Sequence, residues 1–377
     1  MQRLLRYLWL SLLWGGVAVY LCYAASLARS ARKAAVVTGL EVVLADSTAH
    51  GSLVRSNEVR KWLAQRGLKT VGEPCDSVRL TAIEQLILRN GFVGAAEAGI
   101  GGDGVLRIVI TQREPLMRLH LDGMDRYVTS EGYLFVPPRR SARYVPVVGG
   151  SYQPPVPTRY EGLVRDHIDH EQWKIDTMIR FLEHSKLPHH AAERKVERQL
   201  KEVRRMRVSR QWWKLEREES FEERIREKRE EKARLRRKYR YQLRCIAAEI
   251  DRIDQRQERL RKEQKKLEKK YEDFSKLLTF VEQLESDDFW GSEVVEIIAQ
   301  TTPSGALELQ LVPRSGRFTI AFGRIERVEE KFEKLERFYQ DGLSLVGWDR
   351  FRVVDIRFSN QVVCRSRRPD RFSKTKK

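Results

Sequence analysis

The longest hydrophobic stretch of the chain lies near its start, between Tyr7 and Ala28, and contains no charged residue in 22 positions. A helix of that length spans roughly 33 Å, enough to cross the hydrocarbon core of a bilayer. Trp14 and Tyr20 belong to the aromatic residues of this stretch, a type enriched at membrane interfaces. The pattern predicts one transmembrane helix over residues 7–28, held in a lipid bilayer.

A cleaved signal peptide is the alternative interpretation of this stretch. Ser26-Leu27-Ala28 resembles a small-residue cleavage site, but the apolar core of a signal peptide usually has about 7–15 residues. The greater length favours a retained anchor. Basic residues flank both ends, so the positive-inside rule does not give the orientation of the helix.

Residues 36–112 change between strand and helix spacing in the order β-α-α-β-β. Helices are expected to begin at Ser56 and near Ser77, and the last two strands are expected at residues 92–98 and 105–111. The glycine-rich segment between those strands could cradle phosphate only if it opened a helix. Its position between two strands predicts a turn instead.

Short apolar runs separated by Gly and Pro fill residues 113–186, which also contain a predicted helix near 162–184. Similar strand-like runs return in residues 273–364, around an amphipathic helix at 326–339. The tail, residues 365–377, is basic and expected to be disordered. The fold class is therefore α+β, with a mixed β domain that is interrupted by the intervening segment.

That segment, residues 187–272, has a strong coiled-coil pattern. Neither Gly nor Pro occurs between Pro188 and Gly291, and apolar residues recur at alternating spacings of four and three. Gln257 and Gln264 also fall on this seam, where they are expected to weaken it and to restrict its register or partners. The apolar seam positions are Leu243, Ile246, Ile250, Ile253, Leu260 and Leu267.

The two β-rich parts lie on either side of this segment. If they form one domain, the segment has to return close to where it leaves. One helix of about 95 residues would separate its ends by roughly 140 Å, whereas an antiparallel hairpin would bring them together and project roughly 65 Å. A hairpin is therefore favoured, although the sequence leaves a single long helix open and gives no oligomeric state.

The charge of the chain is concentrated in the same segment. The formal net charge is +19, and residues 191–270 alone contain 30 Lys and Arg against 17 Asp and Glu. A basic helix followed by heptads could be a DNA-binding leucine zipper. Because both signs are so dense, and because an anchor and β domains flank the segment, a solvated helix face is favoured and no nucleic acid is expected.

No set of catalytic residues is evident, and no cofactor is expected. The sequence lacks a nucleophile elbow, a P-loop and an HExxH motif. His167, His170 and Glu171 could lie on one helical turn, but no third ligand position accompanies the two histidines, so no metal site is predicted. The four scattered cysteines predict neither a zinc site nor a disulfide framework.

Several segments resemble the bacterial cell-division family FtsQ/DivIB. The similar features are an Arg-Glu-Pro segment at residues 112–119, a Ser-Glu-Gly hairpin at 127–135, Phe322-Gly323-Arg324 ahead of the amphipathic helix, and the segments at 347–348 and 354–358. Their order and spacing carry the resemblance, which leaves out about 187–272.

The resemblance implies a POTRA-like domain at residues 36–112 and a scaffold rather than an enzyme. It implies that residues 1–6 are cytoplasmic and that the body lies in the periplasm, at the septum of the inner membrane. The implied partners are FtsB and FtsL-type division proteins and other divisome components. Through them the chain would help to recruit and regulate septal peptidoglycan synthesis.

A partner strand is implied beside the final strand, near residues 361–365. An open edge has unpaired N–H and C=O groups that another strand can use. Core packing is the alternative role of Phe358, and Val363→Pro is expected to remove a backbone donor from the edge. The implied contact residues are Phe358, Asn360, Gln361, Val362, Val363 and Cys364.

The sequence allows more than one role for the coiled-coil segment and a rival function for the whole chain. The coiled-coil segment could reach peptidoglycan, another divisome component or a second copy, or it could be a spacer that pairs only with itself. A periplasmic adaptor of an efflux or secretion system is the rival function, because it also has an anchor, a helical hairpin and β domains. Such an adaptor would need lipoyl half-motifs directly beside the hairpin, where this sequence predicts helices.

Overall fold

The computed structural model describes residues 13–25, 35–45, 53–138, 143–208, 217–343, 347 and 350–367. The chain forms two compact units. One unit joins Met1–Val164 with Ser275–Lys377, and the other is Arg165–Phe274. The helical unit therefore begins at residue 165, and α4 (Val164–Arg205) continues without a break through the expected boundary after Lys186.

Residues 13–25 form a helix on which Trp14 and Tyr20 are exposed. The remainder of the expected 7–28 span, including Tyr7 and Ala28, lies outside the described residues. Within the part of the chain that the structure describes, no helix combines the length and the apolar character that crossing a bilayer requires.

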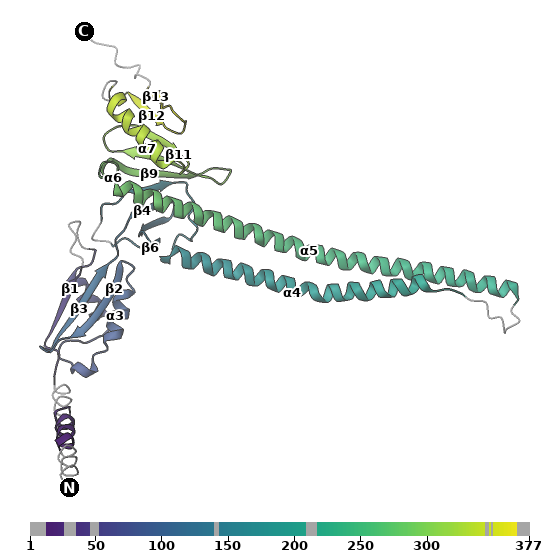
Figure 1. Ribbon diagram of the computed structural model, residues 1–377, viewed down its shortest axis with the longest axis horizontal. Helices are drawn as coiled ribbons and strands as arrows, with labels where there is room; N and C mark the ends of the chain where they lie inside the picture. Colours follow the sequence, from purple (N-terminus) through teal and green to yellow (C-terminus); the bar gives the residue numbers. More distant parts are fainter. Residues whose placement is uncertain are drawn as a thin grey trace, which may run out of the picture. The chain divides into compact units, whose positions relative to one another are not determined.

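The β-α-α-β-β order expected for residues 36–112 is confirmed (Figure 1). The chain forms β1 (Gly39–Leu44), α2 (Ser56–Gln65), the short 3₁₀ helix η1 (Cys75–Ser77), α3 (Leu80–Leu88), β2 (Val93–Ile100) and β3 (Val105–Gln112). The sheet order is β1-β3-β2, with β1 parallel and β2 antiparallel to β3. Val59 and Leu63 of α2 and Ile83 and Ile87 of α3 pack with alternate residues of β3 to form the core.

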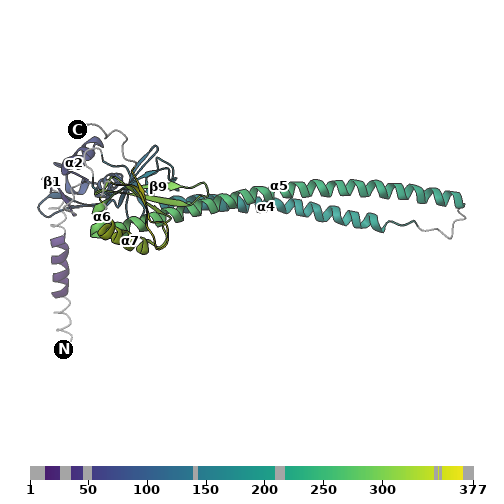
Figure 2. The same cartoon turned by 90° about the horizontal axis from the view of Figure 1, so that it is seen from above.

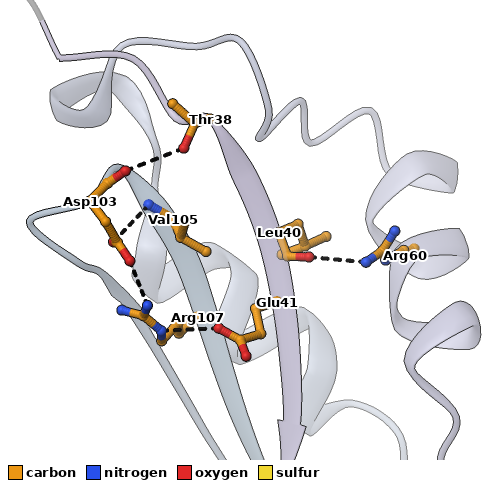
Figure 3. Close-up of polar contacts among 7 residues, drawn as sticks. All are labelled: Thr38, Leu40, Glu41, Arg60, Asp103, Val105 and Arg107. Atoms are coloured by element: carbon orange, nitrogen blue, oxygen red, sulfur yellow. Dashed lines mark hydrogen bonds and ion pairs between the residues drawn. The ribbon is translucent and has the colours of Figure 1, made fainter.

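Polar side chains reinforce the central pairing of this sheet (Figure 3). Arg107 of β3 donates from Nε to Glu41 of β1 at 3.0 Å and from Nη2 to Asp103 at 2.5 Å. The Asp103 carboxylate also accepts the backbone N–H of Val105, and these hydrogen bonds lower its pKa. Asp103 thereby closes the glycine-rich β2–β3 turn, which joins two strands as the sequence predicts.

The β domain is built on a ten-stranded sheet in the order β13-β12-β11-β10-β9-β7-β4-β5-β6-β8. Its first part contains β4 (Met117–Leu121), β5 (Met124–Val128), β6 (Tyr133–Phe135), β7 (Val147–Gly150) and β8 (Gly162–Leu163). Its second part contains α6 (Asp288–Glu293), β9 (Val294–Thr301), β10 (Leu307–Pro313), β11 (Thr319–Gly323), α7 (Val328–Arg337), the π-helical turn η2 (Phe338–Leu343), β12 (Phe351–Asp355) and β13 (Val363–Ser366).

Residues on both sides of the helical unit share this sheet. The parallel pairing of β7 with β9 joins the two parts, with Val148 opposite Ile297. The two parts therefore belong to one β domain, as the sequence predicts.

An aromatic cluster packs the end of α5 (Glu218–Ser286) onto the second part of the sheet. The ring of Phe280 lies 5.0 Å from that of Phe322 and 6.0 Å from that of Phe332. Trp290 of α6 contacts Phe332 and Tyr339. Asp287 caps α6, because its Oδ1 accepts the backbone N–H groups of Phe289 and Trp290.

The helical unit consists of parts of α4 and α5, which run antiparallel (Figures 1 and 2). Gln264 donates to Asp176, and Lys186 pairs with Asp254. Closer to the end of α4, Lys232 donates to the backbone carbonyl of Met206. The partner on α5 moves back along the chain as the residue on α4 moves forward, which is the hairpin arrangement that the geometric argument favours.

A polar network lies inside this helix pair. Gln257 is 4% exposed and Lys186 is 9% exposed. The Lys186 ammonium donates to Gln257 Oε1 at 2.6 Å and to Glu183 at 3.1 Å, and it pairs with Asp254 at 2.5 Å. Gln257 Nε2 donates to Glu183 and to the carbonyl of Ile179. The buried amide and ammonium thus both have partners, as burial of polar groups requires.

Candidate functional site

β13 is the last strand of the ten-stranded sheet and pairs only with β12 among the described strands. The pairing is antiparallel, with Val363 opposite Asp355 and Cys364 opposite Val354. The outer side of β13 consequently has no sheet neighbour in the described part of the chain. Such an edge can accept a further strand.

The hydrogen bonds of β12 determine which β13 groups face that open side. The Ile356 N–H donates to the carbonyl of Ala321, so Val354 and Ile356 direct their backbone groups toward β11. Neighbouring residues of a strand direct them to opposite sides, so Val353 and Asp355 face β13. Val363, opposite Asp355, faces inward, and Cys364 directs its N–H and C=O to the open edge. A proline at Val363 would therefore break the β12–β13 pairing, and the expectation that it removes an edge donor is wrong.

The predicted contact residues lie together at this edge but differ in exposure. Phe358 is 46% exposed, which argues against the core-packing alternative. Asn360 has a left-handed backbone with φ of 60°, a conformation that asparagine tolerates better than most residues. Gln361 and Val363 are exposed, and Val362 and Cys364 are half-buried.

A groove of about 620 Å³ runs beside the same segment. Asn360, Gln361 and Val362 form one wall, and α7 and η2 form the other. The α7 residues at its rim are Glu330, Glu333, Lys334 and Arg337. The groove therefore presents charges of both signs directly before the open strand.

Two basic side chains of the α7 region hold the loop that leads into β13. Lys334 donates to the carbonyl of Phe358 at 2.5 Å, and Arg327 donates to the Ser359 hydroxyl at 3.1 Å. The hydrophobic pattern predicts the amphipathic helix but does not identify these two basic residues. In the sequence they are marked only as basic residues on the polar face of a helix, and many solvated helices share that feature.

An ion pair supports the strand beneath the edge. Asp355 of β12 is 5% exposed and accepts hydrogen bonds from the Arg357 guanidinium at 2.9 and 2.6 Å. Burial acts to raise the pKa of Asp355, but the Arg357 side chain and backbone N–H outweigh it, so the pKa lies below its ordinary value. Burial raises the pKa of the Cys364 thiol, which makes it a poor nucleophile at neutral pH.

The coiled-coil seam residues lie on the least exposed side of α5. Leu243, Ile246, Ile250, Ile253, Leu260 and Leu267 are all half-buried. Between Tyr239 and Leu267, Gln242 is the only half-buried residue off the seam. This pattern fits a helix with one packed side.

Within the described residues, no group of three or more His, Cys, Asp or Glu side chains could hold a metal ion.

The Arg-Glu-Pro segment lies where the two domains of the first unit meet. Gln112 accepts the backbone N–H groups of Leu53 and Val54 at 2.6 and 3.0 Å. The next residue, Arg113, places its guanidinium 3.7 Å from the centre of the Tyr133 ring, a cation–π contact. The segment thus leads from β3 into β4 and contacts β6 through Arg113.

The chain matches two family models in this order. Residues 35–111 match the POTRA-like domain, and residues 250–365 match the domain described as FtsQ/DivIB, C-terminal related. The second match begins inside α5, ahead of the start at residue 273 expected for this part of the β domain. No curated protein is similar enough to count as a relative. With a POTRA-like domain followed by the FtsQ/DivIB C-terminal related domain, the chain is an FtsQ/DivIB-type protein.

Proposed function

We propose that this protein is a membrane-anchored divisome scaffold that binds a strand of an FtsB or FtsL-type partner along β13. In this role it helps to recruit and regulate septal peptidoglycan synthesis. The family domains give it a role in cell division, with divisome proteins as partners in general, and the family is a non-catalytic one. The open edge at Cys364 is the observation that supports the specific proposal.

The mode of binding follows from the chemistry of that edge. A partner strand would pair with the outward N–H and C=O of Cys364, and side chains flanking the strand would enter the groove beside Asn360. Backbone pairing supplies affinity with little sequence preference. Specificity would then come from the charges of both signs on α7, of which Glu333 and Arg337 face the groove.

The experiment compares Cys364→Pro with Cys364→Ala. Proline removes the outward N–H and is tolerated in an edge strand when that N–H points away from the sheet. Loss of one hydrogen bond, worth about 1.4 kcal/mol at the upper end of the usual range, corresponds to about tenfold weaker binding of the partner's soluble segment in calorimetry. The alanine variant keeps the N–H and should bind as the wild type does.

Circular dichroism of both variants checks that the sheet is intact. Equal affinity of the proline and alanine variants, with both folded, would rule out strand addition at this edge. The family role in division would survive that result, because it rests on the two domain matches.

A further inference from the structure

The helical unit contains a basic segment that the scaffold role does not use. Residues 194–208, the end of α4 and the three residues after it, have seven Lys and Arg and two acidic residues. Residues 232–248 of α5 have seven Lys and Arg and no acidic residue. The two stretches face each other, since Lys232 donates to the carbonyls of Arg204 and Met206 at 2.9 and 3.0 Å.

The neighbouring stretch of α5 shows that this charge is not a general property of the helix. Residues 251–267 are as long as residues 232–248 and also have seven Lys and Arg, but four acidic residues are interspersed among them. Lys262 forms an ion pair with Glu258 at 2.8 Å there. In contrast, none of the basic side chains in residues 194–208 and 232–248 pairs with a carboxylate in the described part of the chain.

Such a concentration of like charge is unfavourable without a counter-charge. Neighbouring side chains lie well inside the screening length of about 8 Å at physiological ionic strength. All of the basic side chains except Lys232 and Arg236 are exposed. They are therefore available to an anionic partner.

The composition and arrangement indicate the kind of anion. Arginine outnumbers lysine ten to four in the two stretches, and its planar fork suits phosphate oxygens. Arg234, Arg237, Arg240 and Arg244 fall within an arc of about 120° on a helix of 3.6 residues per turn, so they form one stripe along α5 that a linear chain can follow lengthwise. Tyr241 is the only large aromatic side chain exposed there among the described residues, too few for base stacking along a nucleic acid strand.

We propose that this basic segment binds a flexible, linear phosphodiester polymer without stacking bases, such as a polyol phosphate. Binding would occur through the phosphates alone and would depend strongly on salt. With about six phosphate contacts at a salt slope of roughly −0.7 each, affinity should fall roughly 300-fold between 50 and 200 mM salt.

The test uses the full chain and fluorescently labelled poly(glycerol phosphate). The variant changes Arg234, Arg237, Arg240 and Arg244 to Gln, which keeps helix propensity. The matched control changes Arg252, Arg256, Arg259 and Arg261 to Gln and removes the same charge from the interspersed stretch. All eight arginines are exposed, so neither variant removes a buried side chain from the helix pair.

The first variant should weaken binding roughly 100-fold at physiological salt and reduce the salt effect to roughly tenfold, whereas the control should change little. Equal losses in the two variants would overturn the proposal, because binding would then follow net charge only. Much tighter binding of a single-stranded oligothymidine of equal charge would show base recognition and would also overturn it. So would binding confined to phosphatidylglycerol vesicles or to polyglutamate.

Discussion

The buried network of the helical unit predicts that a single substitution destabilises the helix pair and that a matched second substitution restores most of the stability. Replacing Lys186 with Met removes the ammonium that satisfies Gln257 Oε1. Gln257 is 4% exposed, so water does not replace the lost donor. An unsatisfied buried acceptor costs about 1–3 kcal/mol. Asp254 loses the same ammonium, but its side chain is 53% exposed and can be hydrated, so Gln257 carries most of the cost.

The double variant Lys186→Met, Gln257→Leu should recover most of this loss. It removes both buried polar partners and fills the space with apolar atoms, and such replacements are often neutral or stabilising. The two substitutions should therefore show a favourable coupling of about 1–3 kcal/mol in a double-mutant cycle.

Hydrogen exchange measured by mass spectrometry on peptides covering residues 179–186 and 250–257 is the suitable assay. A chain of several domains does not unfold in one step, so global melting would not isolate the helical unit. If the double variant loses as much protection as the two single variants combined, the groups act independently and the reasoning from burial is wrong.

Three further predictions concern the rest of the fold. Gly150 has φ of 105°, and a Cβ there would clash with the Ala299 carbonyl oxygen, so Gly150→Ala should lower the thermal midpoint of the β domain. Gly123→Ala, with φ of 74° and open space, should cost only about 1–2 kcal/mol of backbone strain; equal melting of the two variants would contradict the steric argument. The lowered pKa of Asp355 adds stability above about pH 3.9, the unfolded value, which is lost as the pH falls through the folded pKa. Asp355→Asn should flatten that acid limb of a pH titration of stability, and an unchanged limb would show that other carboxylates control it. Deleting residues 165–274 should leave partner binding at β13 intact, because the deleted residues and β13 belong to different compact units. A loss of affinity in a folded deletion variant would assign the helical unit a part in that contact.

Periodicity was sufficient to predict most elements of the fold. Alternation predicted the strands of the β-α-α-β-β domain. The residues with the alternating four and three spacing lie on the least exposed side of α5. The boundary after Lys186 was not predicted correctly by composition, because α4 is one continuous helix and Pro188 lies inside it.

The candidate site was harder to predict than the fold. The resemblance indicated the last strand, but which residue of that strand faces outward depends on register, and a shift of one residue reverses every backbone group. The hydrogen bond from the Ile356 N–H to the Ala321 carbonyl distinguishes Cys364 from Val363, and no sequence pattern contains it. The contacts of Lys334 and Arg327 join residues that are 24 and 32 positions away in the sequence, and no local pattern encodes such pairs.

Amide exchange at single residues of β13, followed by NMR with and without the soluble segment of an FtsB-type partner, tests the proposed strand addition most directly. In the free protein the N–H groups of Val363 and Arg365 should be protected by β12, and that of Cys364 should exchange rapidly. Saturation with the partner should protect Cys364 strongly, because its N–H then lies between two strands. Rapid exchange at Cys364 in a complex that is demonstrably bound would contradict pairing along this edge.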